Sequence, residues 1–125
     1  MKQKKKKIIL IAEDDLFLSK MIEDHLKGEG FTVDLAKDGE TALNKIKEND
    51  YALVLLDLIM PKRNGFEVLK ELKDAKIKTT PIIIFSNLSQ AEDEEEALQL
   101  GARAYYVKHN ISLSKLTEII SEFMK

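Results

Sequence analysis

Short apolar runs of about five residues alternate along the chain with stretches in which apolar residues recur every three or four positions. An unbroken apolar run predicts a β-strand buried on both faces, whereas the three-to-four spacing predicts an amphipathic helix. The alternation repeats five times with no linker or low-complexity segment, which indicates one βα-repeating domain. The apolar runs predict strands at residues 8–12, 31–36, 51–56, 81–85 and 104–107.

The five predicted helices are recognised by apolar stripes and by residues that start or stop a helix. Glycines follow the first and fourth helices, at 16–27 and 91–100, and an Asp-Gly pair at 38–39 starts the second. The last helix covers residues 112–124. The residues predicted to face inward are Leu18, Met21, Ile22 and Leu26; Ala42, Leu43 and Ile46; Phe66, Leu69 and Leu72; and Leu113, Leu116, Ile119, Ile120 and Phe123.

Five βα units in 125 residues predict an open sheet, because an eight-stranded barrel needs a longer chain. The expected fold class is α/β, a flavodoxin-like doubly wound (βα)5 domain. Its five-stranded parallel sheet has the order 2-1-3-4-5 and carries helices on both faces. The chain divides into a basic N-terminal leader at 1–7 and one folded domain at 8–125.

Composition and charge narrow the function classes. With 44% hydrophobic and 34% charged residues, the chain has the composition of a folded domain. The formal net charge is −2 and no aromatic residue lies among the leader lysines, so we expect a solvated leader and no direct nucleic-acid binding. The lack of cysteine excludes thiolate metal sites and favours a reducing, cytoplasmic location. The apolar runs are far shorter than the roughly twenty residues that span a bilayer, and no export signal is recognised.

Polar residues follow the predicted strands, and parallel strands bring such residues together at one edge of the sheet. Taken singly, each has an ordinary explanation as a helix cap, a turn residue or a surface charge. Taken together, clustered carboxylates repel one another and favour a bound cation, and hard oxygen ligands favour Mg²⁺, with Mn²⁺ as an alternative. The residues at the strand ends are Glu13, Asp14 and Asp15, then Asp57, Ser86 and Lys108.

A divalent ion, an ammonium and a hydroxyl in one pocket suit a phosphoryl group. Its oxygens can be shared among the metal, the Lys108 ammonium and the Ser86 hydroxyl. Asp57, directly after the central strand, is then placed as a carboxylate nucleophile that forms an aspartyl phosphate.

These motifs resemble the receiver domain of response regulators of two-component systems, the CheY-like family, over essentially the whole chain. In order along the chain, the matching segments are residues 8–15, 55–61, Asn64-Gly65, 84–86, Gly101-Ala102 and 105–108. The resemblance implies a phosphorylation-dependent signalling switch. The phosphoryl donor would be a histidine kinase or a histidine phosphotransfer protein, and an unidentified output protein or domain would respond. Such a domain is not an enzyme beyond its own phosphoryl transfer and dephosphorylation.

The resemblance also implies residue roles. Asp57 would be the phosphoacceptor and a metal ligand, with Asp14 ligating Mg²⁺ directly and Glu13 holding a metal-bound water. The backbone carbonyl of Ile59 would complete the protein ligands. Ser86 and Lys108 would contact the phosphoryl group. As switch residues, Ser86 would move and Tyr105 would turn inward, which changes the surface of the fourth helix, fifth strand and fifth helix. Asp15 would cap the first helix.

Two positions depart from the family pattern. The family's lysine is usually followed by proline, often through a cis bond, but His109 follows Lys108 here. Because a cis bond before a residue other than proline costs about 2.5–4 kcal/mol, we predict a trans bond, with Asn110 available for an unusual turn. Asn87 replaces the small residue that usually follows the serine, which narrows access to the phosphoryl site.

Other functions fit the residues less well. A haloacid-dehalogenase-type phosphatase needs a second Asp where Ile59 stands, and a flavodoxin-like cofactor binder needs a phosphate loop where the chain is acidic. A pseudo-receiver scaffold and the receiver portion of a longer regulator remain alternatives. His25 and His109 are interpreted as structural or solvent-exposed residues.

Overall fold

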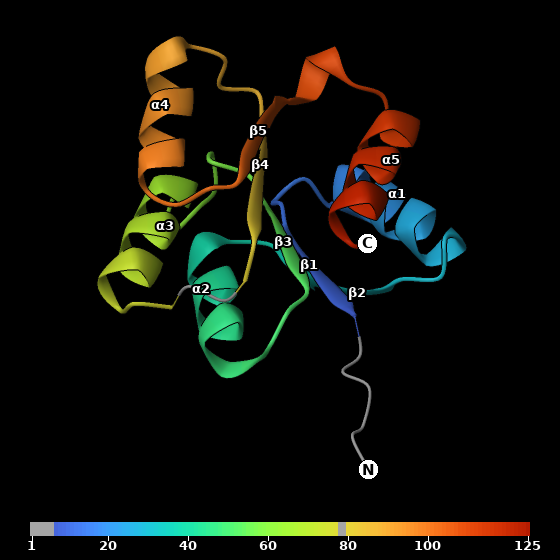
Figure 1. The fold of residues 1–125 in the computed structure, drawn as a ribbon, viewed down its shortest axis with the longest axis horizontal. Coiled ribbons are helices and arrows are strands. Elements are labelled where there is room, and N and C mark those ends of the chain that lie inside the picture. The colour runs from blue at the N-terminus through green and yellow to red at the C-terminus, as the bar shows by residue number, and fades with distance from the viewer. Residues whose placement is uncertain (1–6, 78–79) are drawn as a thin grey trace.

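All strands pair in parallel in one sheet of order β2-β1-β3-β4-β5, in the computed structural model that describes residues 7–77 and 80–125. The fold class and strand order predicted from the sequence are therefore confirmed. Figure 1 shows β3 in the middle of the sheet, between β1 and β4. The strands are β1 (Ile8–Ala12), β2 (Thr32–Ala36), β3 (Leu53–Leu56), β4 (Ile82–Ser86) and β5 (Ala104–Val107).

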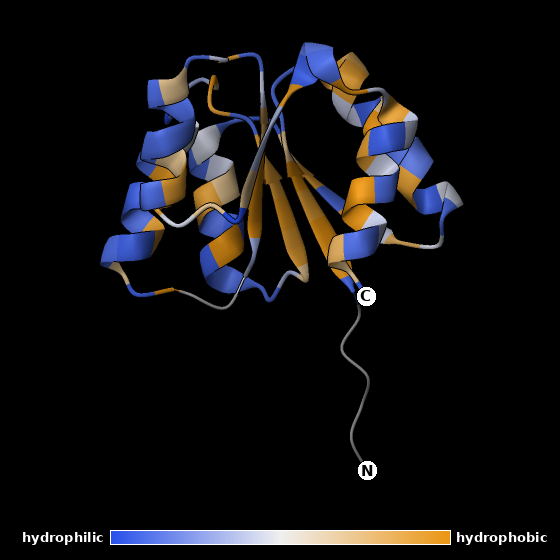
Figure 2. Cartoon of the chain, turned by 45° about the horizontal axis from the view of Figure 1, so that its top comes forward, coloured by the Kyte–Doolittle hydropathy of each residue, from blue (hydrophilic) through white to orange (hydrophobic). Residues whose placement is uncertain are grey.

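Helices cover both faces of the sheet, and Figure 1 shows α1 and α5 on one side with α2, α3 and α4 on the other. Each face therefore has its own hydrophobic core, and the apolar strands contribute side chains to both cores. Figure 2 shows the strands in the middle of the sheet as hydrophobic, in contrast to the mixed helices, and the edge strand β2 includes the polar residues Thr32 and Asp34. The helices are α1 (Leu16–Gly28), α2 (Gly39–Glu48), α3 (Gly65–Asp74), α4 (Ala91–Gln99) and α5 (Leu113–Phe123).

Strand β1 shows how one short strand serves both cores. Ile9 and Ile11 pack in the core under α1 and α5, whereas Leu10 and Ala12 pack in the core under α2, α3 and α4. Successive strand residues point to opposite faces, so a strand between two helical layers must be apolar at every position. The chain leaves β1 at Glu13, whose side chain is buried at the strand end.

Side-chain caps fix where the helices begin. Asp15 accepts a hydrogen bond from the Leu18 amide at 3.1 Å, which confirms its predicted role as the cap of α1. Asp38 caps α2, and Asn64 forms a reciprocal capping box with Glu67 in α3. These caps place the loops after β1, β2 and β3 at defined positions above the sheet.

Two apolar residues predicted to face inward do not. Met21 is 37% exposed, because the buried side of α1 is turned toward Ser19 and Glu23. The Ser19 hydroxyl donates to the Leu16 carbonyl and Glu23 pairs with lysines of the same helix, so both polar residues tolerate burial. Phe123 is 38% exposed because it lies in the last turn of α5, beyond the buried Ile120.

Two further predictions concern strand and domain limits. Strand β3 begins at Leu53 and not at residue 51, where the buried Tyr51 instead donates a 2.6 Å hydrogen bond to Asp34 of β2. The predicted leader at 1–7 lies outside the described residues apart from Lys7. Within 7–77 and 80–125, none of the helices is long and apolar enough to cross a membrane.

Candidate functional site

The residues predicted from the strand ends lie along one edge of the sheet. Glu13 follows β1, Asp57 follows β3, Ser86 ends β4 and Lys108 follows β5. Because these four strands are neighbours, the four residues lie along the same edge although the chain separates them widely, and Lys108 contacts both Glu13 and Asp57. Glu13, Asp57 and Ser86 are buried, and Asp14 beside them is exposed. The predicted edge site is therefore present in the fold.

The carboxylates form a compact acidic cluster. Oxygens of Glu13, Asp14 and Asp57 all lie within 4.8 Å of one another. Burial raises the pKa of Glu13 above its ordinary value, and the nearby Asp57 charge adds to this, while hydrogen bonds from Lys108 and the Asp15 amide oppose it. Three oxygen donors at this spacing, one of them exposed, suit a hard divalent cation such as Mg²⁺.

Lys108 bridges the two buried acids. Its ammonium lies 2.6 Å from Glu13 Oε1 and 2.9 Å from Asp57 Oδ2. Burial lowers the Lys108 pKa, but its bonds to Asp57 and Glu13 outweigh burial and raise the pKa overall. The lysine therefore stays charged beside Asp57. Glu13 therefore contacts Lys108 directly, in addition to the role of holding a metal-bound water that the resemblance implies.

Ser86 and Tyr105 both contact the loop residue Leu88. The fully buried Ser86 Oγ accepts a 3.4 Å hydrogen bond from the Leu88 amide, and the Tyr105 hydroxyl donates to the Leu88 carbonyl at 2.7 Å. Burial and then the charges of the acidic helix α4 raise the pKa of Tyr105 to about 12. Tyr105 is half-buried. A single peptide segment thus joins the two predicted switch residues.

The backbone near Asp57 and Lys108 agrees with most sequence predictions. The Ile59 amide donates to Asp57 Oδ1 at 3.2 Å, while the Ile59 side chain is 54% exposed. The Lys108–His109 peptide is trans, which confirms that prediction. The predicted unusual turn at Asn110 is wrong, because Asn110 ends a short 3₁₀ helix that begins at Lys108.

The two histidines lie away from the acidic cluster. His25 is exposed on α1 with its Nδ1 3.1 Å from the Met21 carbonyl oxygen, and His109 is exposed in the 3₁₀ helix. Neither residue joins the group of possible metal ligands found among the described residues.

Comparison with known proteins identifies the family. The protein-family model of the response regulator receiver domain matches residues 9–121 of the chain. The chain belongs to this family, the receiver domains of response regulators in two-component systems. It is 41% identical over 100 residues to the transcriptional regulatory protein DltR of Streptococcus agalactiae and 36% identical over 117 residues to a gliding motility regulatory protein of Myxococcus xanthus.

These matches cover 80% and 92% of the chain but only 44% and 15% of the two relatives. The chain thus spans less than half the length of these relatives. Response regulators receive phosphoryl groups from histidine kinases and act through output domains.

Solved structures agree with the family assignment. The receiver domain of the Francisella response regulator 1452 has a TM-score of 0.86 and 30% identity, covering 94% of this chain and 96% of that one. The response regulator TrrA of Thermotoga maritima, solved in complex with Mg²⁺ and BeF, has a TM-score of 0.80 and 30% identity, covering 94% and 98%. Receiver domains bind Mg²⁺ in an acidic pocket, and this chain has such a cluster.

Proposed function

We propose that Asp57 is the phosphoacceptor of this receiver domain and that a histidine kinase or histidine phosphotransfer protein is its donor. The observation that carries the proposal is the contact of Lys108 with both Asp57 and Glu13 at the edge of the sheet. A permanently charged ammonium beside a buried carboxylate serves to stabilise further negative charge at that point. An exposed surface lysine would have no such use.

The carboxylates of Glu13, Asp14 and Asp57, together with the backbone carbonyl of Ile59, would hold Mg²⁺, or Mn²⁺ in its place. The ion supplies positive charge that offsets both the acidic cluster and the phosphoryl oxygens. The rest of the transfer falls to the chain itself. An Asp57 oxygen forms a bond to phosphorus while the bond between phosphorus and the donor histidine nitrogen breaks, and Lys108 pairs with a phosphoryl oxygen.

The switch follows from the contacts at Leu88. When the Ser86 hydroxyl turns to a phosphoryl oxygen, it gives up its long bond with the Leu88 amide. The Tyr105 hydroxyl, bound to the Leu88 carbonyl, then moves with this segment. Because Tyr105 belongs to β5, the change reaches the surface formed by α4, β5 and α5. That surface is the contact for an output protein or domain.

Several expectations complete the proposal. The domain acts on no substrate beyond its own phosphoryl group, and it contacts no nucleic acid directly. The lack of cysteine supports a cytoplasmic location. Dehalogenase-type hydrolysis is disfavoured, because Ile59 places no carboxyl group where that chemistry needs an acid.

Incubation with acetyl phosphate and Mg²⁺, followed by intact mass measurement, tests the proposal. The wild type should gain one phosphoryl group, and Asp57→Asn or excess EDTA should abolish the gain. Asp24→Asn, at an exposed acid of α1, is the matched control and should react like the wild type. Incorporation that survives Asp57→Asn would contradict the assigned acceptor. An unreactive wild type would favour the pseudo-receiver alternative.

A further inference from the structure

Gly39, the first residue of α2, lies against the backbone of the loop that follows β3. A Cβ atom at Gly39 would overlap the Arg63 carbonyl oxygen and stand 2.6 Å from the Arg63 carbonyl carbon. Real Cβ atoms do not approach backbone this closely. Any other residue at this position must push α2 and the loop apart.

The same helix end also holds the loop by polar contacts. The Gly39 amide donates to the Pro61 carbonyl at 3.3 Å. The Lys62 ammonium lies 3.8 Å from Asp38, the cap of α2. Lys62 itself has a φ of 69°, a left-handed conformation that costs a non-glycine residue energy. The surrounding contacts therefore impose the path of this loop.

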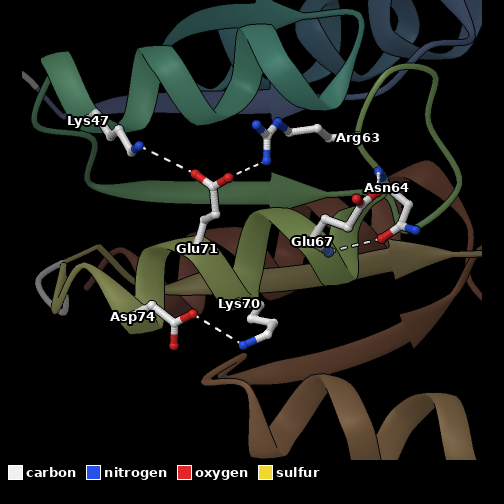
Figure 3. A network of polar contacts seen from close by, with 7 residues as sticks. All are labelled: Lys47, Arg63, Asn64, Glu67, Lys70, Glu71 and Asp74. Carbon is white, nitrogen blue, oxygen red and sulfur yellow. Dashed lines mark hydrogen bonds and ion pairs between the residues drawn. The ribbon is translucent and has the colours of Figure 1, made fainter.

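A second attachment joins the loop to α2 and α3 through Glu71, as Figure 3 shows. Glu71 of α3 pairs with Arg63 of the loop and, at 3.4 Å, with Lys47 of α2. The capping box of Asn64 and Glu67 fixes the next residue along. Segment 61–64 is thus attached to two helices that lie outside the acidic cluster.

Ile59 is held between this attached segment and the end of β3. Its neighbours Leu58 and Met60 are both buried in the core under α2, α3 and α4. The Gly65 amide donates to the Leu58 carbonyl at 2.9 Å, so the loop is also closed at its base. We therefore expect a displacement of residues 61–63 to alter the position of Ile59, which is separated from this segment by Met60 alone.

We propose that Gly39 is a positioning residue for the metal site: it sets the β3–α3 loop at the place where the Ile59 carbonyl completes the ligands of the divalent ion. The inference rests on the proposed function, because it assumes that Ile59 and the acids hold Mg²⁺. Gly39 touches neither the ion nor the phosphoryl group. It acts through the close approach that only a residue without a side chain permits.

Mg²⁺ titration of Gly39→Ala, followed by amide NMR, tests this role. We expect Mg²⁺ affinity to fall by about 10–100-fold, as is typical when the support of a metal ligand is lost. The Ile59 and Met60 amide resonances should already shift in EDTA, because the loop moves without the ion. Gly28→Ala is the matched control, since a Cβ there meets nothing within 4 Å. Its Mg²⁺ affinity should equal that of the wild type.

Glu71→Gln provides a second variant that introduces no clash. It removes the charge that pairs with Arg63 and Lys47, so Mg²⁺ affinity should fall, though less than in Gly39→Ala. Asp74→Asn is its control, because Asp74 pairs only with Lys70 of the same helix among the described residues (Figure 3). If Gly39→Ala does not fold, the Mg²⁺ affinity of Glu71→Gln shows whether the attachment of the β3–α3 loop supports the metal site.

Thermal unfolding in EDTA separates positioning from general stability. A Gly39→Ala protein that melts earlier yet binds Mg²⁺ like Gly28→Ala would overturn the inference, as would unchanged affinity in Glu71→Gln. A wild type that binds no Mg²⁺ would instead overturn the proposed function, and with it the basis of the inference about Gly39. Weakened binding in the folded variants, with unchanged binding in both controls, supports it.

Discussion

The two loops beside Asp57 are built in opposite ways. The β3–α3 loop is attached to α2 and α3 by Gly39 and by the Arg63–Glu71 pair, whereas a capping box at the helix start is common to both loops. The β4–α4 loop is held at Leu88 by one hydrogen bond from Tyr105 and one long hydrogen bond to Ser86. A loop that supplies a ligand must hold its position, whereas a loop that reports phosphorylation must move.

The helices that follow the loops differ in the same sense. Helix α3 buries three large apolar residues, Val68, Leu69 and Leu72, whereas α4 buries only Ala97. A helix that is barely anchored in the core can shift at little cost in buried area. The comparison predicts that the β3 side of the site is the more rigid one and that α4 can shift more easily.

The largest expected effect comes from truncating one apolar residue in each helix. Leu72→Ala should lower the free energy of unfolding by about 2–5 kcal/mol, because it leaves a cavity in the core. Leu98→Ala, at a residue that is 42% exposed on α4, should change it by about 0.5 kcal/mol or less. Urea denaturation measures both. Similar losses in the two variants would break the comparison.

A smaller effect is expected when the bond that holds the β4–α4 loop is removed. Tyr105→Phe loses the hydrogen bond to the Leu88 carbonyl and should reduce stability by about 1 kcal/mol. Amide hydrogen exchange should accelerate at residues 88–90 and stay unchanged at residues 59–63. Tyr106→Phe is the control, since its hydroxyl makes no hydrogen bond within the described residues. Equal acceleration in both loops would show that they are not independent.

The smallest effect concerns Asp38, which caps α2 and approaches Lys62 of the fixed loop. The hydrogen bond from the Thr41 amide, with help from nearby lysine charge, lowers the pKa of Asp38 below its ordinary 3.8. A lowered carboxyl pKa stabilises the fold above that ordinary value, and this stability is lost as pH falls through the folded-state pKa.

Asp38→Asn keeps a capping side chain but has no charge. The wild type should therefore be more stable than the variant at pH 7 by about 0.3–1 kcal/mol, the usual effect of a charge at a helix N-terminus. Thermal unfolding between pH 7 and pH 3 should show the difference shrinking toward the acid end. If the stability difference is unchanged at pH 3, the charge of Asp38 is not its cause.

The sequence predicts those features that depend on local pattern. Uninterrupted apolar runs identify strands buried on both faces, and the residues that end such strands must meet at one edge, so Asp57 and Lys108 are found from the sequence. The cap at Asp15 follows from its position before an apolar helix. The trans peptide after Lys108 follows from the lack of proline.

Other features depend on contacts between distant segments. The overlap that excludes a side chain at Gly39 involves the backbone of Arg63, and no residue pattern records a backbone path. The inward turn of Ser19 and Glu23 is hidden because polar residues are buried there by pairing within their own helix. The bond between Tyr51 and Asp34 likewise joins segments that are adjacent only in the folded sheet.

The small core contribution of α4 has an evolutionary consequence. Of its nine residues only Ala97 is buried, so eight positions can change without disturbing the interior. Substitutions there escape the selection against unfolding that restricts α3. Under the proposed function, descendants of one receiver can therefore acquire different recognition surfaces on α4 while they inherit the same phosphorylation chemistry. Paralogues within one cell can then diverge in their partners before they diverge in their fold.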